Sequence, residues 1–306
     1  MNDVLKKASM SPLRKLIWIL AEIPRRLRAY WRLIKSLQTA VLLITGVAGY
    51  VSGCCLHLSG SSLVGVVGSL FLAISGSTVL NMVYDRDIDA IMPRTCRRPL
   101  PAGTVSYAEA LTLGLVLAVG GVGWALAMAW LYGLIVLAGL LLDVVVYTIW
   151  LKRRTPYSIL IGGLSGGMPA LAGRTLAVGQ VDLVGILLAL AILFWIPIHI
   201  MTFSIKYASD YSRAQVPTFP SMYGVTATRR TIAFSSLLGS GLMLSVAWNV
   251  GVEPTALWIL GGMSLVLLGL VALLAIRPSD KLNFGLFKYA SLYMLTAMLI
   301  LIVQAF

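Results

Sequence analysis

Three side chains with oxygen atoms follow one another at helical spacing near the end of an apolar stretch. Asn81, Asp85 and Asp89 stand at i, i+4 and i+8, which places them along one face of a helix. Such oxygens suit Mg²⁺, which keeps several waters and bridges carboxylates to a substrate phosphate. Asp87 falls on another face and is not expected to bind metal. The spacing therefore predicts a Mg²⁺ site that receives a phosphate group.

Basic residues follow this acidic motif at once. Arg94 and Arg98 stand directly after it, and arginine binds phosphate oxygens in a bidentate manner. Acids that hold metal beside arginines that hold phosphate form a pyrophosphate-binding arrangement. The alternative is a helix end with solvated charges. That alternative explains the arginines but not three aligned oxygen ligands that begin inside an apolar segment.

A second, weaker cluster lies near residue 210. Asp210 is a candidate for a second Mg²⁺, and Lys206 and Arg213 are placed to meet phosphate. Lys152 and Arg153, in an earlier basic loop, are further candidates for stabilising a departing pyrophosphate. We expect all of these residues on the same side of the membrane as Asp85.

Two ionisable side chains stand inside apolar segments. His199 precedes Asp210 by roughly 16 Å along a continuous helix. It either contacts a substrate or stabilises a kink near Pro197 by a backbone hydrogen bond. Asp143 either points into a cavity or pairs with a neighbouring hydroxyl. The other histidine, His57, is expected to be interfacial and inert.

Composition and pattern identify the elements that must position these residues. The chain has 306 residues, of which 59% are hydrophobic and 11% charged, against roughly 25% charged residues in soluble proteins. Apolar blocks of about 20 residues fit helices that span a bilayer. We predict an all-α integral membrane protein with about nine transmembrane helices, at 38–57, 62–84, 108–127, 129–151, 157–175, 182–206, 231–250, 255–276 and 286–305.

The basic residues predict the orientation. With nine spans, every Lys and Arg except Arg174 falls on one side. The positive-inside rule then places the N-terminus and the motif loops in the cytoplasm and Phe306 outside a plasma membrane. The net charge of +13 is thus explained by topology, and no nucleic-acid partner is expected. Residues 1–36 read as a basic amphipathic segment on anionic membrane lipids, followed by the transmembrane domain, 37–306.

The motifs resemble the UbiA superfamily of intramembrane prenyltransferases, from about residue 30 to the C-terminus. Asn81, Asp85 and Asp89 match its first aspartate motif, and nine spans match its helical bundle around a central cavity. Four further stretches resemble the heme-modifying members: Asp85–Pro99; Tyr147–Pro156; Trp195, Pro197 and His199; and Asp210–Pro217. Ser158 and Gln215 depart from that pattern.

The resemblance implies Mg²⁺-dependent transfer of a farnesyl group from farnesyl diphosphate to a vinyl group of heme b. Asn81, Asp85, Asp89 and Asp210 would hold Mg²⁺, and His199, Trp195 and Tyr147 would contact the acceptor. His199 would ligate the heme iron or shuttle a proton. The rival acceptors are a quinone precursor and a glycerol-phosphate lipid, neither of which needs His199. A transporter or channel is the rival outside enzymes, but its ionisable residues would not crowd one membrane face.

Overall fold

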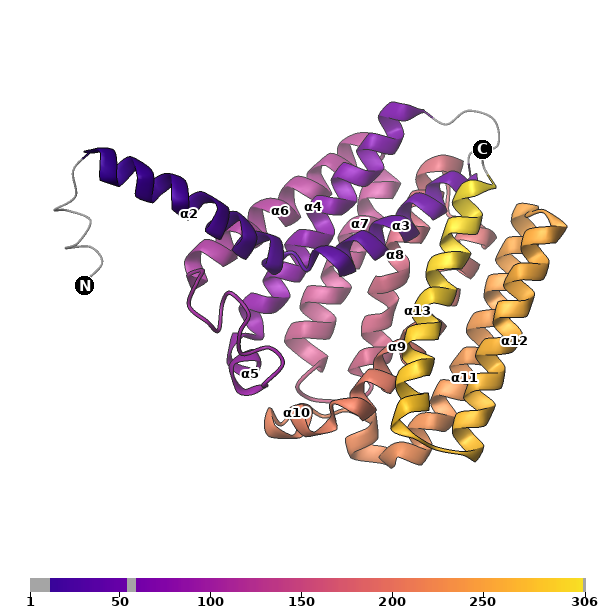
Figure 1. Cartoon of the computed structure of the whole chain (residues 1–306). Coiled ribbons are helices and arrows are strands. Elements are labelled where there is room, and N and C mark those ends of the chain that lie inside the picture. The colour runs from indigo at the N-terminus through magenta and orange to yellow at the C-terminus, as the bar shows by residue number, and fades with distance from the viewer. Residues whose placement is uncertain (1–11, 54–58, 305–306) are drawn as a thin grey trace.

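The computed structural model describes residues 12–53 and 59–304, with backbone only for 12–22. Residues 1–11 of the amphipathic segment, His57, and the ends of two predicted spans lie outside these residues. The described residues form helices and connections without strands (Figure 1). The helices are α2 Pro12–Leu33, α3 Ser36–Gly53, α4 Gly60–Tyr84, α5 Arg86–Ile91, α6 Tyr107–Met128, α7 Trp130–Leu141, η1 Leu142–Leu151, α8 Ser158–Val178, α9 Leu183–Lys206, α10 Ala208–Arg213, α11 Phe219–Val250, α12 Pro254–Ile276 and α13 Asp280–Val303.

Each predicted span has its helix, and the all-α membrane fold is confirmed. Among the described residues, eight helical segments are long and apolar enough to cross a membrane, with α7 and η1 counted as one segment. The ninth predicted span corresponds to α8, which contains many small residues and Arg174 and is not among the eight. The chain is therefore a multi-pass membrane protein.

Small residues bring α3 and α8 into close contact at the centre of the bundle. A Cβ atom added at Gly49 would lie 2.0 Å from the Ala170 carbonyl oxygen, and one at Gly173 would lie 2.1 Å from that of Gly46. No larger side chain fits at either position without moving backbone. Close backbone approach through small residues is a common way for helices to pack in lipid, and it fixes two walls of the central cavity.

The segment between α7 and the next loop is a π-helix. In η1 the backbone N–H of Lys152 donates to the carbonyl of Tyr147, five residues earlier, at 2.8 Å. A π-helix shifts the angular position of the side chains that follow it, and such segments are frequent at functional sites. Asp143, Tyr147 and Thr148 all stand on this segment. The sequence pattern predicted a regular helix here.

Helix breaks place the two acidic motifs at one end of the bundle. Asp85 leaves the helical conformation between α4 and α5, with φ −84° and ψ 7°, and Tyr207 separates α9 from α10 in the same way. Figure 1 shows α5 and α10 at the same end, with the C-terminal end of α13 opposite. The expected helix running from His199 to Asp210 is therefore interrupted at Tyr207, so the predicted distance along one axis was wrong.

Candidate active site

Two adjoining cavities lie inside the bundle. The smaller, of about 290 Å³, lies near α5 and is lined by acidic and basic side chains. The larger, of about 810 Å³, is mostly apolar and lies deeper among the long helices. Their shared lining forms the junction between them, made by Lys35, Gln38, Tyr147, Ile159, His199, Ile200 and Phe287. The arrangement suits a substrate with a charged head and an apolar tail.

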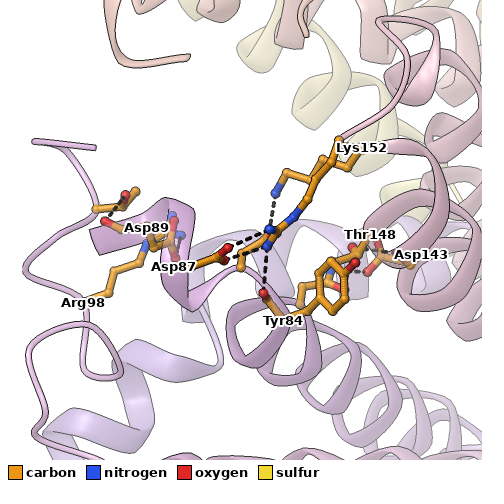
Figure 2. A network of polar contacts seen from close by, with 11 residues as sticks. Tyr84, Asp87, Asp89, Arg98, Asp143, Thr148 and Lys152 are labelled. Atoms are coloured by element: carbon orange, nitrogen blue, oxygen red, sulfur yellow. Dashed lines mark hydrogen bonds and ion pairs between the residues drawn. The ribbon is translucent and has the colours of Figure 1, made fainter. Parts of the chain in front are cut away.

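Two buried acids face basic partners in the charged pocket. Asp85 and Asp89 are only 5% and 4% exposed. The Lys152 ammonium donates to Asp85, and Arg98 Nη1 donates to Asp89 Oδ2 at 2.6 Å. Figure 2 shows Arg98 beside Asp89, and Lys152 directed toward the end of α4 at Tyr84. Burial alone would lower the pKa of Lys152, but its electrostatic interactions with Tyr147 and with the Asp85 carboxylate raise it, so its ammonium stays charged.

Asp87 points away from this pocket. Its two carboxylate oxygens each accept from Arg153 at 2.7 Å, and its side chain is 62% exposed. The hydrogen bonds from Arg153 hold the pKa of Asp87 below its usual value. Arg153 also donates to the Tyr84 carbonyl and does not line the charged pocket. The ion pair of Asp87 and Arg153 therefore stabilises the break between α4 and α5 from outside the charged pocket.

The acids of the charged pocket fit a divalent cation in part. Asp85 Oδ1 is buried and accepts no hydrogen bond, with Arg153 Nη2 at 3.9 Å, so this carboxylate oxygen has a lone pair available for a metal. Within the described residues, no three His, Cys, Asp or Glu side chains lie close enough to enclose an ion. Asn81 lines the larger cavity instead, and the buried Asp210 lines neither. Two carboxylates completed by water and phosphate oxygens match the coordination habit of Mg²⁺.

A polar network ties α4 to η1 beside the metal candidates. Asp143 Oδ2 accepts from Asn81 Nδ2 at 2.8 Å and from the Ser77 hydroxyl. The Thr148 hydroxyl donates to Asn81 Oδ1 at 2.8 Å, and Figure 2 shows Thr148 beside Asp143. Asp143 also lines the large cavity. Both readings of this acid hold, because it pairs with a neighbouring hydroxyl and faces the cavity.

The predicted basic residues divide into two groups. Arg94, Arg98 and Lys152 line the charged pocket. The Arg94 guanidinium lies 4.9 Å from the Phe203 ring centroid and 5.4 Å from that of Tyr207, so stacking holds it at the rim. The other three, Arg153, Lys206 and Arg213, do not line the pocket.

Sequence reasoning missed Lys35 as a site residue. It was counted only as one of the basic residues that set topology, yet its side chain lines both cavities. Its φ of 45° is a left-handed conformation that a non-glycine residue rarely adopts. Burial, with added repulsion from Arg98 and Lys152, lowers the pKa of Lys35 to about 8. A basic residue at the junction of two helices was the only available signal.

Aromatic rings hold His199 in the large cavity. Its imidazole stacks between Trp195, 4.8 Å away between ring centroids, and Phe287, 4.4 Å away. Trp195 Nε1 donates to the Ala290 carbonyl at 2.7 Å. The predicted acceptor residues His199, Trp195 and Tyr147 all line this cavity. Gly162, Gly163 and Gly166 line it too, whereas Gly167 packs against the Ala189 backbone.

Comparison with known proteins supplies the wider context. Residues 42–296 match the model of the UbiA prenyltransferase family. The protoheme IX farnesyltransferase of Korarchaeum cryptofilum is 42% identical over 206 residues, which cover 67% of this chain and 69% of that protein. The protoheme IX farnesyltransferase of Archaeoglobus fulgidus is 41% identical over 213 residues, covering 69% of this chain and 74% of that protein.

Solved structures share the fold. A digeranylgeranylglyceryl phosphate synthase superposes with a TM-score of 0.77 at 21% identity, covering 92% of this chain and 99% of that one. A UbiA homologue from Archaeoglobus fulgidus, bound to GPP and Mg²⁺, superposes with a TM-score of 0.63 at 16% identity, covering 90% of this chain and 99% of that one. At these identities the likeness concerns the fold.

Proposed function

The chain belongs to the UbiA prenyltransferase family, and we propose that it transfers a farnesyl group from farnesyl diphosphate to heme b with Mg²⁺, giving heme O. The observation that carries the proposal is the charged pocket opening into a large apolar cavity that contains His199. The relatives named protoheme IX farnesyltransferase support the choice of donor and acceptor.

The diphosphate binds in the charged pocket. Asp85 and Asp89 hold Mg²⁺, with Asn81 and Asp210 as the further predicted ligands. Bound Mg²⁺ neutralises the negative charge that develops on the leaving group. Lys152 and Arg98 now neutralise these carboxylates, and we propose that they turn to phosphate oxygens when the metal binds. Arg94 and Lys35 complete the cationic wall.

The remaining predicted basic residues act outside this wall. Arg153 secures the helix break through Asp87. Lys206 and Arg213 are exposed near α10, and we propose that they attract the diphosphate from the cytoplasmic side before it enters the pocket.

The farnesyl chain passes the junction into the apolar cavity. Departure of pyrophosphate leaves an allylic cation at the junction, where the Tyr147 ring stabilises it and the apolar walls exclude water. The π electrons of a heme vinyl group form the new carbon–carbon bond. Water then adds to the resulting cation and loses a proton to solvent, which completes a hydroxyethylfarnesyl side chain. Trp195 and His199 position the porphyrin.

We further propose a location in the plasma membrane. The N-terminus and the charged pocket face the cytoplasm, the C-terminus faces outside, and α2 rests on anionic lipids. A cysteine at Ser209 should then react with a membrane-impermeant thiol reagent only from the cytoplasm, and one at Ser59 only from outside. Labelling of both from one side would contradict this orientation.

Pyrophosphate release tests the reaction class. Purified protein with farnesyl diphosphate, Mg²⁺ and heme b should release pyrophosphate, and omission of Mg²⁺ or heme b should stop the release. Release that depends on a hydroxybenzoate or a glycerol phosphate instead of heme b would reassign the acceptor. No release with any acceptor would contradict the prenyltransferase proposal.

A further inference from the structure

Asp143 is an acid inside the membrane bundle to which the proposed reaction gives no role. Among the described residues that line the large cavity, it is the only Asp or Glu. It stands on the π-helix η1, one turn before Tyr147, which lies at the junction of the two cavities. An ionisable side chain at membrane depth is costly and marks a candidate functional site. The hydrogen bonds of this carboxyl group indicate what it can do.

The two carboxylate oxygens of Asp143 differ in their partners. Oδ2 accepts from two side chains of α4, the Ser77 hydroxyl and Asn81 Nδ2, the latter at 2.8 Å. Oδ1 accepts no hydrogen bond from any residue that the structure describes and, unlike Asp85 Oδ1, it is not buried. The carboxyl group is therefore held by one oxygen and presents the other to the large cavity.

A free carboxylate oxygen in an otherwise apolar cavity is a binding place for water. A water molecule needs enough room and at least about two polar partners, and the cavity of about 810 Å³ has the room. The first partner is Asp143 Oδ1, because an ionised acceptor makes a stronger hydrogen bond than a neutral one. The second is the Ser77 oxygen, which lines the same cavity and accepts from none of the described residues. A water that donates to both oxygens keeps its own lone pairs for the cavity.

We infer that Asp143 and Ser77 bind the water molecule that becomes the hydroxyl group of the product. This inference rests on the proposed function. Bond formation at the terminal vinyl carbon leaves a cation on the neighbouring vinyl carbon. The bound water gives an electron pair to that carbon, a carbon–oxygen bond forms, and one water proton passes to solvent. Asp143 stays ionised throughout, so it positions the water and takes no proton.

A positioned water also decides which product forms. Without it, the cation would lose a proton from the newly bonded CH₂ group, and a carbon–carbon double bond would form in place of the alcohol. The two prenylated porphyrins differ in mass by one water. Their ratio therefore reports on the bound water, separately from the formation of the carbon–carbon bond.

Asp143→Asn tests the inference with a change of nearly equal shape. Ser77 and Asn81 donate to the held oxygen, so the new amide places its carbonyl oxygen there and turns its NH₂ group, which is only a donor, to the cavity. With farnesyl diphosphate, Mg²⁺ and heme b, the ratio of hydroxylated to dehydrated product should fall by about 100-fold, the scale of misplacing one reactant. Mass spectrometry measures this ratio. Pyrophosphate release should stay near the wild-type rate, because it precedes the addition of water.

Ser77 has a matched control on the same helix. Ser77→Ala keeps the carboxylate but removes one partner of the water, and should lower the product ratio by about threefold to tenfold, the scale of one hydrogen bond. Ser75→Ala removes a buried hydroxyl of α4 that has no partner among the described residues and does not line the large cavity. It should leave the ratio unchanged.

The outcomes separate this inference from the proposed function. If the wild type makes the hydroxylated porphyrin and Asp143→Asn gives the same product ratio, the water site is wrong and the proposed function stands. An equal fall in pyrophosphate release and in hydroxylated product would also overturn the inference, because Asp143 would then act before water adds. If Asp143→Asn does not fold, an unchanged ratio in Ser77→Ala overturns it. If the wild type prenylates no porphyrin, the proposed function itself fails.

Discussion

The two cavities differ in how the fold supplies their side chains. The charged pocket takes its acids and bases from helix breaks and loops, at Asp85, Asp89, Arg98 and Lys152. The apolar cavity takes its walls from the long helices, through aliphatic, small and aromatic residues. Charge at membrane depth is costly, and the charged side chains that line the two cavities belong to the charged pocket, with the exception of Asp143. The difference separates a site for the leaving group from a site for the carbon chemistry.

Both acids of the charged pocket are paired with a base before any ligand enters. Each of its two acids has a basic partner within the pocket, because an unpaired buried charge costs several kcal/mol. A metal–diphosphate complex brings both signs of charge and replaces both pairs at once. A ligand that enters the apolar cavity replaces no ion pair among the described residues that line it. A substitution in one cavity should therefore change the affinity for the ligand of that cavity and leave the affinity for the ligand of the other cavity unchanged.

The largest expected effect comes from the acids. Asp85→Asn or Asp89→Asn removes a charged metal ligand and should lower turnover by at least about 100-fold, the scale of losing one electrostatic stabiliser. Hemin binding should remain, since neither acid lines the apolar cavity. Steady-state rates and hemin titration measure the two effects. Equal loss of both in folded protein would show that the cavities do not act separately.

The second prediction concerns the apolar cavity, which a larger side chain at Gly166 would narrow. A Cβ at Gly166 would lie 2.6 Å from Ile196 Cδ1, the end of a flexible side chain, so Gly166→Leu can fit by filling cavity space. We expect overpacking of about 1–3 kcal/mol to appear as weaker hemin binding. Calorimetry should show unchanged Mg²⁺-dependent binding of a farnesyl diphosphate analogue with a shortened tail. Weakened binding of that short analogue would contradict the claim that the two cavities bind their ligands independently.

The junction should respond to pH through Lys35. Its pKa is about 8 because burial disfavours the charged form, so the ammonium is present below pH 8 and lost above it. Diphosphate affinity should fall by about threefold to tenfold between pH 7 and 9, measured by calorimetry. Lys35→Arg keeps its charge throughout and should flatten the profile. An unaltered profile in this variant would assign the pH dependence to another group.

The smallest effect is expected at the exposed ion pair of Asp87 and Arg153. Asp87 is exposed and bound to Arg153, and exposed ion pairs contribute up to about 1 kcal/mol. Asp87→Asn should lower thermal stability slightly and leave the metal dependence of turnover intact. A loss as large as that of Asp85→Asn would make Asp87 a ligand and would invalidate the assignment of helix faces.

Sequence reasoning reached the fold and the grouping of Asp85, Asp89 and Arg98 in one pocket because both follow from local pattern. Apolar blocks predicted the helices, and i, i+4 spacing separated Asp85 and Asp89 from Asp87. The helix break at Asp85 and the π-helix at Asp143 depend on packing between distant segments, and neither leaves a clear signal in the pattern. Lys35 enters the site only through the way α2 and α3 meet the other helices, so its place there required the structure.

The most direct test of the central claim is the product of a reaction with isotope-labelled farnesyl diphosphate and heme b. Purified protein with Mg²⁺ should yield a porphyrin whose mass has increased by one labelled farnesyl group and one hydroxyl group, with the iron retained. Substitution of Asp85 by Asn should abolish this species. Recovery of unmodified heme b, with label transferred to a hydroxybenzoate or a glycerol phosphate when these are supplied, would contradict the account of the apolar cavity as a heme site.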